Sequence, residues 1–179
     1  MIHQGAAPLD ARQVRIRPAG PGDCPFILGL AARLDAGGLP PWHDPDKFHA
    51  FHQEGIDHTA AAVLAIDAGR VTDHAVFLAE ASGRDGAIPL GVLHLKDDHS
   101  FLTGESQGYI EVLAITREAE GCGVGWALMR AAEGWARGRG HRLLALDTAG
   151  VNAHARAFYR RCGYEEEVVK YVKGLEAGT

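Results

Sequence analysis

The stretch that decides the fold of this chain is Ile115-Thr116-Arg117-Glu118-Ala119-Glu120-Gly121-Cys122-Gly123-Val124-Gly125. It follows an apolar run, residues 109–115, that is typical of a β-strand, and it opens residues 123–139, where apolar side chains recur at helical spacing. The alternating glycines allow the backbone to turn tightly with its amide hydrogens pointing inward. Because a helix N-terminus carries partial positive charge, the loop predicts a phosphate-binding turn. The alternative is a tight strand-to-helix connection that binds nothing.

The spacing of the glycines excludes two familiar phosphate sites. A dinucleotide-binding loop requires Gly-x-Gly-x-x-Gly, and the last position of that pattern is Trp126 when counted from Gly121 and Leu128 when counted from Gly123. A nucleoside-triphosphate loop requires Gly-Lys followed by Ser or Thr, which the sequence lacks. Coenzyme A is the remaining familiar ligand that carries a pyrophosphate.

Strand and helix patterns extend from this loop in both directions. The expected strands cover residues 14–17, 75–81, 90–95, 109–115, 143–146 and a final extended stretch, 164–175. The expected helices cover residues 23–34 with Asp23 as the cap, 46–66 with an interruption at Gly55, 123–139 and 152–162; residues 97–108 are expected to form a polar loop. This order predicts a mixed α/β fold, with a six- or seven-stranded sheet and helices on both faces.

Composition limits the class of protein. The chain has 179 residues, 46% of them hydrophobic, and 18 Lys+Arg against 23 Asp+Glu give a net charge of -5. A length of this order suits one domain, expected at residues 13–179 after a flexible lead, 1–12. The negative charge argues against a broad nucleic-acid interface. No apolar run reaches the roughly 20 residues of a membrane helix, and no secretory signal is recognisable, so we expect no membrane contact. The odd number of cysteines suits a reducing compartment, so we expect a cytoplasmic protein.

The sequence predicts no metal site. Of ten histidines, His49 and His52 share one side of an expected helix. No Cys or Glu-x-x-His partner lies nearby, so we expect both to be solvated or packed rather than to bind a metal.

Residues 109–175 resemble the core of the GCN5-related N-acetyltransferase family, in which a strand, an Arg/Gln-x-x-Gly-x-Gly/Ala loop and a helix bind the pyrophosphate of acetyl-CoA. Gly123, Val124 and Gly125 match the end of that motif, whereas Glu120 stands where the family has Arg or Gln, which removes one cation. Residues 152–164 are similar to the family's Asn-x-x-Ala-x-x-Phe-Tyr-x-x-x-Gly-Phe/Tyr segment and match it at every named position.

The resemblance implies a mostly antiparallel sheet, acetyl-CoA as co-substrate, no metal, and a homodimer formed through the final strands. It also implies which residues contact the cofactor. These are Leu113, Ala114 and Ile115, whose backbone groups pair with the pantetheine arm, and Glu120, Gly121, Cys122, Gly123, Val124, Gly125, Trp126, Asn152, Ala155 and Tyr159.

Two residues are the candidates for catalysis. Tyr159 is the candidate general acid for the departing thiolate, since a phenol is a proton donor, and a core aromatic is the alternative. Glu111 is a carboxylate inside an apolar run, expected on the strand face of Tyr109 and Leu113. It is the candidate base if burial raises its pKa, and a half-solvated charge is equally compatible with the pattern. Asn152 is explained as well by a helix N-cap as by cofactor contact.

Weaker roles are expected elsewhere. His94 and Glu105 are secondary candidates for the base, and Cys122 and Cys162 are expected to pack.

Aromatic and acidic residues that could form the acceptor site are Trp42, His43, Phe48, Phe51 and Phe101, and Asp44, Asp46, Asp97, Asp98 and Glu105. The acidic surplus favours a small cationic primary amine. Together the expectations describe an acetyl-CoA-dependent N-acetyltransferase that transfers an acetyl group to a primary amine of a small molecule or peptide by direct attack in a ternary complex. The alternative is a non-catalytic acyl-CoA-binding regulatory module.

Overall fold

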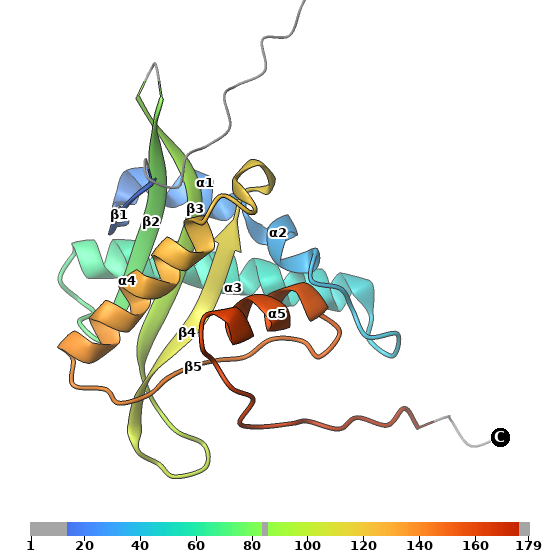
Figure 1. The fold of residues 1–179 in the computed structure, drawn as a ribbon. Coiled ribbons are helices and arrows are strands. Elements are labelled where there is room, and N and C mark those ends of the chain that lie inside the picture. The colour runs from blue at the N-terminus through green and yellow to red at the C-terminus, as the bar shows by residue number, and fades with distance from the viewer. Residues whose placement is uncertain (1–13, 84–85, 176–179) are drawn as a thin grey trace, which may run out of the picture.

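A five-stranded mixed sheet organises the chain (Figure 1). The computed structural model describes residues 14–83 and 86–175, so the expected N-terminal lead lies outside the described part. The strands are β1 (Val14–Pro18), β2 (His74–Gly83), β3 (Gly86–His99), β4 (Ser106–Ile115) and β5 (Leu144–Leu146), and they lie side by side in this order. The first four pair antiparallel, and β4 pairs with β5 parallel. The mixed α/β class is therefore confirmed.

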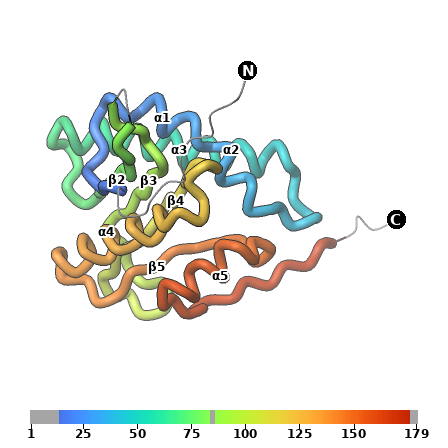
Figure 2. Tube along the Cα trace, turned by 45° about the horizontal axis from the view of Figure 1, so that its top comes forward, coloured from blue at the N-terminus to red at the C-terminus, as the bar shows by residue number. Residues whose placement is uncertain are grey.

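Helices cover both faces of the sheet, as predicted (Figure 1). On one face α3 (Pro45–Asp67), with α1 (Cys24–Leu28) and α2 (Ala31–Asp35), buries an apolar cluster against Val92 and Val112. On the other face α4 (Val124–Gly138) packs on Leu93, Leu95 and Ile110. The remaining elements are the short helices η2 (Pro21–Asp23) and η3 (Arg117–Ala119), and α5 (Ala153–Arg161), which lies beside β5 (Figure 2).

The strand count was overestimated. Residues 164–175 have no secondary structure and run away from the sheet (Figure 1), because their backbone meets no neighbouring strand edge among the described residues. Conversely, half of the loop expected at 97–108 is sheet: β3 continues to His99, β4 begins at Ser106, and residues 100–105 connect them.

Two local predictions about the first helices were also wrong. The segment 24–35 forms two short helices rather than one, and Asp23 does not cap α1: its carboxylate accepts from the Arg17 guanidinium at 2.6 Å and from the Gly20 amide. The second helix is not interrupted at Gly55, since α3 is continuous from Pro45, with Asp44 accepting from the amides of its first turn. No helix of the described chain is long and apolar enough to cross a bilayer.

A β-bulge in β4 sets the geometry of the site. His94 pairs with Val112 and the next residue, Leu95, pairs with Ile110, so that Glu111 is an extra residue in β4. The bulge changes which residues face which helix: Ile110 and Leu113 pack toward α4, whereas Glu111 lies against His58 of α3. The prediction that Glu111 shares a face with Leu113 was therefore wrong, because strand alternation breaks at the bulge.

Close approach of β3 and β4 at Gly91, which pairs with Ile115 at the end of β4, gives a testable stability prediction. A Cβ atom added at Gly91 would lie 2.8 Å from the Ala114 carbonyl oxygen and 3.2 Å from Ile115 Cα. We expect Gly91→Ala to lower the free energy of unfolding by about 1–3 kcal/mol in urea denaturation. Gly134→Ala is the matched control, because Gly134 lies inside α4 with nothing within 4 Å of the added Cβ, and alanine there stabilises a helix by about 1 kcal/mol. Equal effects of the two substitutions would contradict the argument.

Candidate cofactor and acetyl-transfer site

The sheet opens between β4 and β5. Only Gly108, Tyr109 and Ile110 pair with β5, and beyond Ile110 no described strand covers that edge of β4. The Thr116 amide donates to Leu90 and the Ala114 carbonyl lies beside Gly91, so these backbone groups face β3. Since backbone groups alternate along a strand, those of Leu113 and Ile115 face the open edge. The edge thus offers main-chain groups to an extended ligand, although the Ile115 carbonyl already accepts from Arg33 and Ala114 does not contribute to the edge as expected.

The glycine loop connects the end of β4 to α4 and so lies at one end of this opening (Figure 1). Gly121 and Gly123 adopt φ angles of 73° and 80°, a left-handed conformation that disfavours other residues. Gly123 is the N-cap of α4 and has no side chain to cap it, and among residues 14–83 and 86–175 no side chain accepts a hydrogen bond from the first turn of that helix. The amides of Val124, Gly125 and Trp126 are therefore free to bind an anion, in a region where the helix dipole adds positive potential.

Gly125 also allows α4, α5 and β4 to meet. A Cβ atom at Gly125 would lie 3.0 Å from the Phe158 ring and 3.1 Å from Ile115 Cδ1. Trp126 packs edge-on against Phe158 and remains 44% exposed. The Cys122 side chain belongs to the cluster beneath α4, which agrees with a packing role.

Arg33 is a residue that the sequence reasoning missed. Its guanidinium, on α2, pairs with the Glu120 carboxylate and donates to the Ile115 carbonyl at 3.0 Å. Arg33 thus places a cation at the junction of the glycine loop and the open edge of β4. No signal in the local sequence points to this contact, because the two partners are 87 positions apart.

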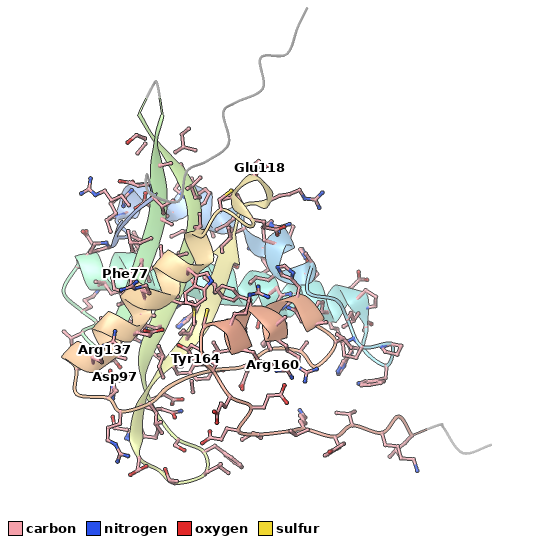
Figure 3. All side chains as sticks on the ribbon, viewed as in Figure 1. Phe77, Asp97, Glu118, Arg137, Arg160 and Tyr164 are labelled. Atoms are coloured by element: carbon pink, nitrogen blue, oxygen red, sulfur yellow. The ribbon has the colours of Figure 1, made fainter. Side chains whose placement is uncertain are left out.

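Helix α5 carries the predicted asparagine and tyrosine. The Asn152 side chain accepts from the Ala155 amide at 3.0 Å, so it is an N-cap. Tyr159 packs among the apolar residues on the α4 side of the sheet. Burial raises the pKa of Tyr159 to about 12, so the phenol keeps its proton at neutral pH. Tyr164, which lies near the end of α5 (Figure 3), has a buried hydroxyl without a hydrogen-bond partner in the described part of the chain.

Glu111 lies where β5 leaves β4, on the other side of the opening from Tyr159. Its Oε1 is 2.6 Å from Lys96 Nζ, and its Oε2 is 3.3 Å from His94 Nδ1 and 3.4 Å from His58 Nε2. Burial by itself raises the pKa of Glu111, but Lys96 and the neighbouring histidines outweigh it and hold the pKa below its usual range. The sequence led us to expect Glu111 as a base if burial raised its pKa. That condition is not met, and the carboxyl of Glu111 is ionised at neutral pH.

The weaker candidates lie away from the opening or are already paired. Burial lowers the pKa of His94 to about 4, so its ring is neutral. Glu105 lies in the β3–β4 connection, where it accepts from Thr103. That end of the sheet also holds Asp97, and it is the opposite end from Glu118 beside the glycine loop (Figure 3).

Several residues considered for the acceptor or for a metal have structural partners. Asp97 is paired with Arg139 and His141, and Asp44 is the cap of α3. Phe101 is 89% exposed in the β3–β4 connection. His49 and His52 both contact Asp35, at 2.6 and 2.7 Å, which agrees with the expectation that they are packed or solvated.

Two sequence comparisons find relatives of this chain. The model of the acetyltransferase (GNAT) family matches residues 38–164. The aminoglycoside N(6')-acetyltransferase type 1 of Stenotrophomonas maltophilia is 36% identical over 95 residues, which are 51% of this chain and 60% of that relative. The match thus spans less than two thirds of the relative's length.

Solved structures share the fold at low sequence identity. A GCN5-related N-acetyltransferase from Ralstonia eutropha JMP134 superposes with a TM-score of 0.64 at 19% identity, covering 92% of this chain and 99% of the other. An aminoglycoside N-acetyltransferase, AAC(6')-Iy in complex with CoA, gives 0.60 at 21% identity, covering 97% and 99%. The family model matches most of the chain, which also has the open edge of β4 and the glycine loop described above. This chain therefore belongs to the GNAT acetyltransferase family.

Proposed function

We propose that this protein is an acetyl-CoA-dependent N-acetyltransferase that acts on a primary amine of a small cationic molecule. One observation carries the proposal: the unpaired edge of β4 leads directly to the uncapped N-terminus of α4. An extended amide-rich arm that ends in a pyrophosphate fits that combination, and coenzyme A has this chemistry.

In the proposed complex the pantetheine arm pairs with Leu113 and Ile115 as an additional strand. The pyrophosphate binds the amides of residues 121–126, with Arg33 beside it. Asn152 contributes by beginning α5, and Ala155 and Tyr159 line the other wall of the opening. The thioester then lies near the bulge, between Tyr159 on the α4 side and Glu111 on the α3 side.

These positions suit direct attack. The amine nitrogen forms a bond to the thioester carbonyl carbon, and its proton passes to the ionised Glu111, directly or through water. Because the pKa of Glu111 is lowered, the carboxylate does not keep this proton, which passes on to solvent. A free backbone amide of β4 stabilises the oxyanion. The carbon–sulfur bond breaks, and Tyr159 donates a hydrogen bond and then a proton to the thiolate. Because Tyr159 is buried and protonated, it is available as this donor.

The acceptor is proposed from chemistry and from the curated relative. The net charge of -5 favours a polycationic substrate, and the matched relative is named as an aminoglycoside N(6')-acetyltransferase. An aminoglycoside amine is therefore the first acceptor to test.

A thiol-release assay tests the function. With acetyl-CoA and a panel of aminoglycosides, polyamines and amino acids, we expect turnover on a polycationic amine. Coenzyme A binding detected by thermal stabilisation, without turnover on any amine, would instead favour the non-catalytic acyl-CoA-binding module.

Opposite effects of Glu120 and Arg33 on cofactor affinity follow from their ion pair. Glu120→Gln removes a negative charge beside the pyrophosphate and frees the Arg33 guanidinium, so we expect the Kd of coenzyme A to fall about tenfold, which corresponds to roughly 1.4 kcal/mol. Arg33→Gln is expected to raise the Kd by a similar factor. Isothermal titration calorimetry measures both, with Glu118→Gln as the matched loop control. A change in the same direction for both variants would contradict the assignment.

Homodimerisation and a cytoplasmic location stay predictions. The stretch that follows α5 exposes Val168, Val169, Tyr171, Val172 and Leu175, which supports an interface there. Gel filtration at micromolar concentration distinguishes monomer from dimer.

A further inference from the structure

Three histidines and one carboxylate from four different elements converge beside the bulge. His58 comes from α3, His74 from the start of β2, His94 from β3 and Glu111 from β4. One nitrogen or oxygen atom of each lies within 4.8 Å of the others. The imidazole rings are in mutual contact, with centroids 5.1–5.9 Å apart. We call these residues the His₃Glu cluster.

The spacing of the cluster matches a first-row transition metal. Ligands about 2.1 Å from a tetrahedral ion lie about 3.4 Å from one another. Glu111 Oε2 is 3.3 Å from His94 Nδ1 and 3.4 Å from His58 Nε2. Imidazole nitrogen and carboxylate oxygen are ligands that Zn²⁺ accepts together.

The carboxylate oxygen that faces the histidines has no other partner. Glu111 Oε2 is buried and makes no hydrogen bond to any residue that the structure describes, whereas Oε1 is occupied by Lys96. An unsatisfied buried carboxylate oxygen is costly, and a cation held between it and the imidazoles removes that cost.

His94 is held as metal-binding histidines usually are. Its ring is fully buried, Thr59 Oγ1 lies 3.1 Å from Nδ1, and His74 Nδ1 lies 2.9 Å from Nε2. Both ring nitrogens thus have a polar neighbour. An ion bound at Nδ1, the nitrogen that faces Glu111, would replace the contact with Thr59, while Nε2 keeps its contact with His74, which orients the ring.

The cluster is accessible from solvent. A cavity of about 170 Å³ is lined by His58 and His74 together with Ala61, Ala62, Ala65 and Val71. The His58 side chain is 56% exposed, so an ion enters from the α3 side without unfolding of the core.

We propose that the His₃Glu cluster is a transition-metal site, that its ligand chemistry suits Zn²⁺, and that the bound ion inhibits acetyl transfer. The inhibitory part rests on the proposed function, because the ion would occupy the free oxygen of the carboxylate proposed as base. Metal binding itself does not depend on that function. Lys96 opposes the ion, since its ammonium already neutralises Glu111.

Binding is tested on the full-length untagged chain, since a histidine tag would itself bind the metal. We expect calorimetry to detect one Zn²⁺ per chain, and Co²⁺ to give visible absorption bands of a four-coordinate site. His58→Ala, which removes a ligand, is expected to weaken Zn²⁺ binding by about 100-fold, and His74→Asn by about 10-fold or more. Lys96→Met is expected to tighten it. His49→Gln/His52→Gln is the matched control and leaves binding unchanged.

The site would be overturned if the chain did not bind Zn²⁺ stoichiometrically. It would also be overturned if the control variant lost Zn²⁺ binding and His58→Ala kept it. Inhibition is followed separately through the acetylated amine by mass spectrometry, because the free thiol of coenzyme A also binds Zn²⁺. Zn²⁺ that binds to the cluster and slows a previously active enzyme supports both parts. Zn²⁺ that binds without inhibition supports the site and overturns the inhibitory part. An enzyme inactive on every amine but still binding Zn²⁺ at the cluster fails the proposed function and leaves the site supported.

Discussion

Tyr159→Phe is expected to lower kcat about 100-fold while the KM for acetyl-CoA changes less than about twofold. The substitution removes one hydroxyl and keeps the ring that packs against Phe158 and the α4 side of the core. A general acid contributes about 10²–10⁴-fold to a rate. We expect the lower end, because a phenol with a pKa of about 12 is a weaker acid than a thiol of about 8.5, so most of its effect is a hydrogen bond to the developing thiolate. Steady-state kinetics with the acceptor found in the thiol-release assay measure it.

Tyr164→Phe is the matched control. The Tyr164 ring lies 6.2 Å from that of Tyr159, and its buried hydroxyl has no partner, so removing it is expected to leave kcat within about twofold and the melting temperature equal or higher. If Tyr159→Phe kept full kcat, or if both variants lost activity equally, Tyr159 would not be the acid.

Glu111→Gln is expected to lower kcat about 100-fold, again with little change in the KM for acetyl-CoA. The amide has nearly the shape of the carboxylate and still accepts from Lys96, but it cannot take a proton from the attacking amine. The assay includes a chelator, so that any metal bound at the His₃Glu cluster does not affect the comparison. Thermal unfolding measures stability separately from rate.

Glu105→Gln is the control for Glu111. Glu105 was the other carboxylate considered as base, and it lies in the exposed β3–β4 connection. We expect it to keep full activity. Full activity of Glu111→Gln, or loss with Glu105→Gln alone, would move the base away from the bulge.

Elements with a strong local pattern were predicted well from the sequence. Residues 75–81, 90–95 and 109–115 all lie in strands, and the helices at 123–139 and 152–162 are within two residues of their observed bounds. Alternation and helical spacing depend on neighbours in the chain, so they are visible without the fold. The extended stretch 164–175 failed because a strand also needs a partner edge, which no local pattern guarantees.

The candidate site was predicted only in part for the same reason. The glycine loop and the N-cap Asn152 are local features and lie where they were expected. The bulge at Glu111 arises from the register between β3 and β4, which a single strand does not reveal. It reversed the expected relation of Glu111 to Leu113 and placed the carboxylate beside Lys96, so its pKa is lowered rather than raised.

The sequence by itself determined the glycine-rich loop, the helix that follows it and the family, because glycine conformation, helical spacing and motif order are properties of short segments. Only the tertiary structure decided which side chains meet. It brought Arg33 to Glu120, left one edge of β4 open, and gathered His58, His74 and His94 around Glu111. These contacts join residues far apart in the chain, and they depend on sheet register and helix packing, which are set by the whole core rather than by any one segment.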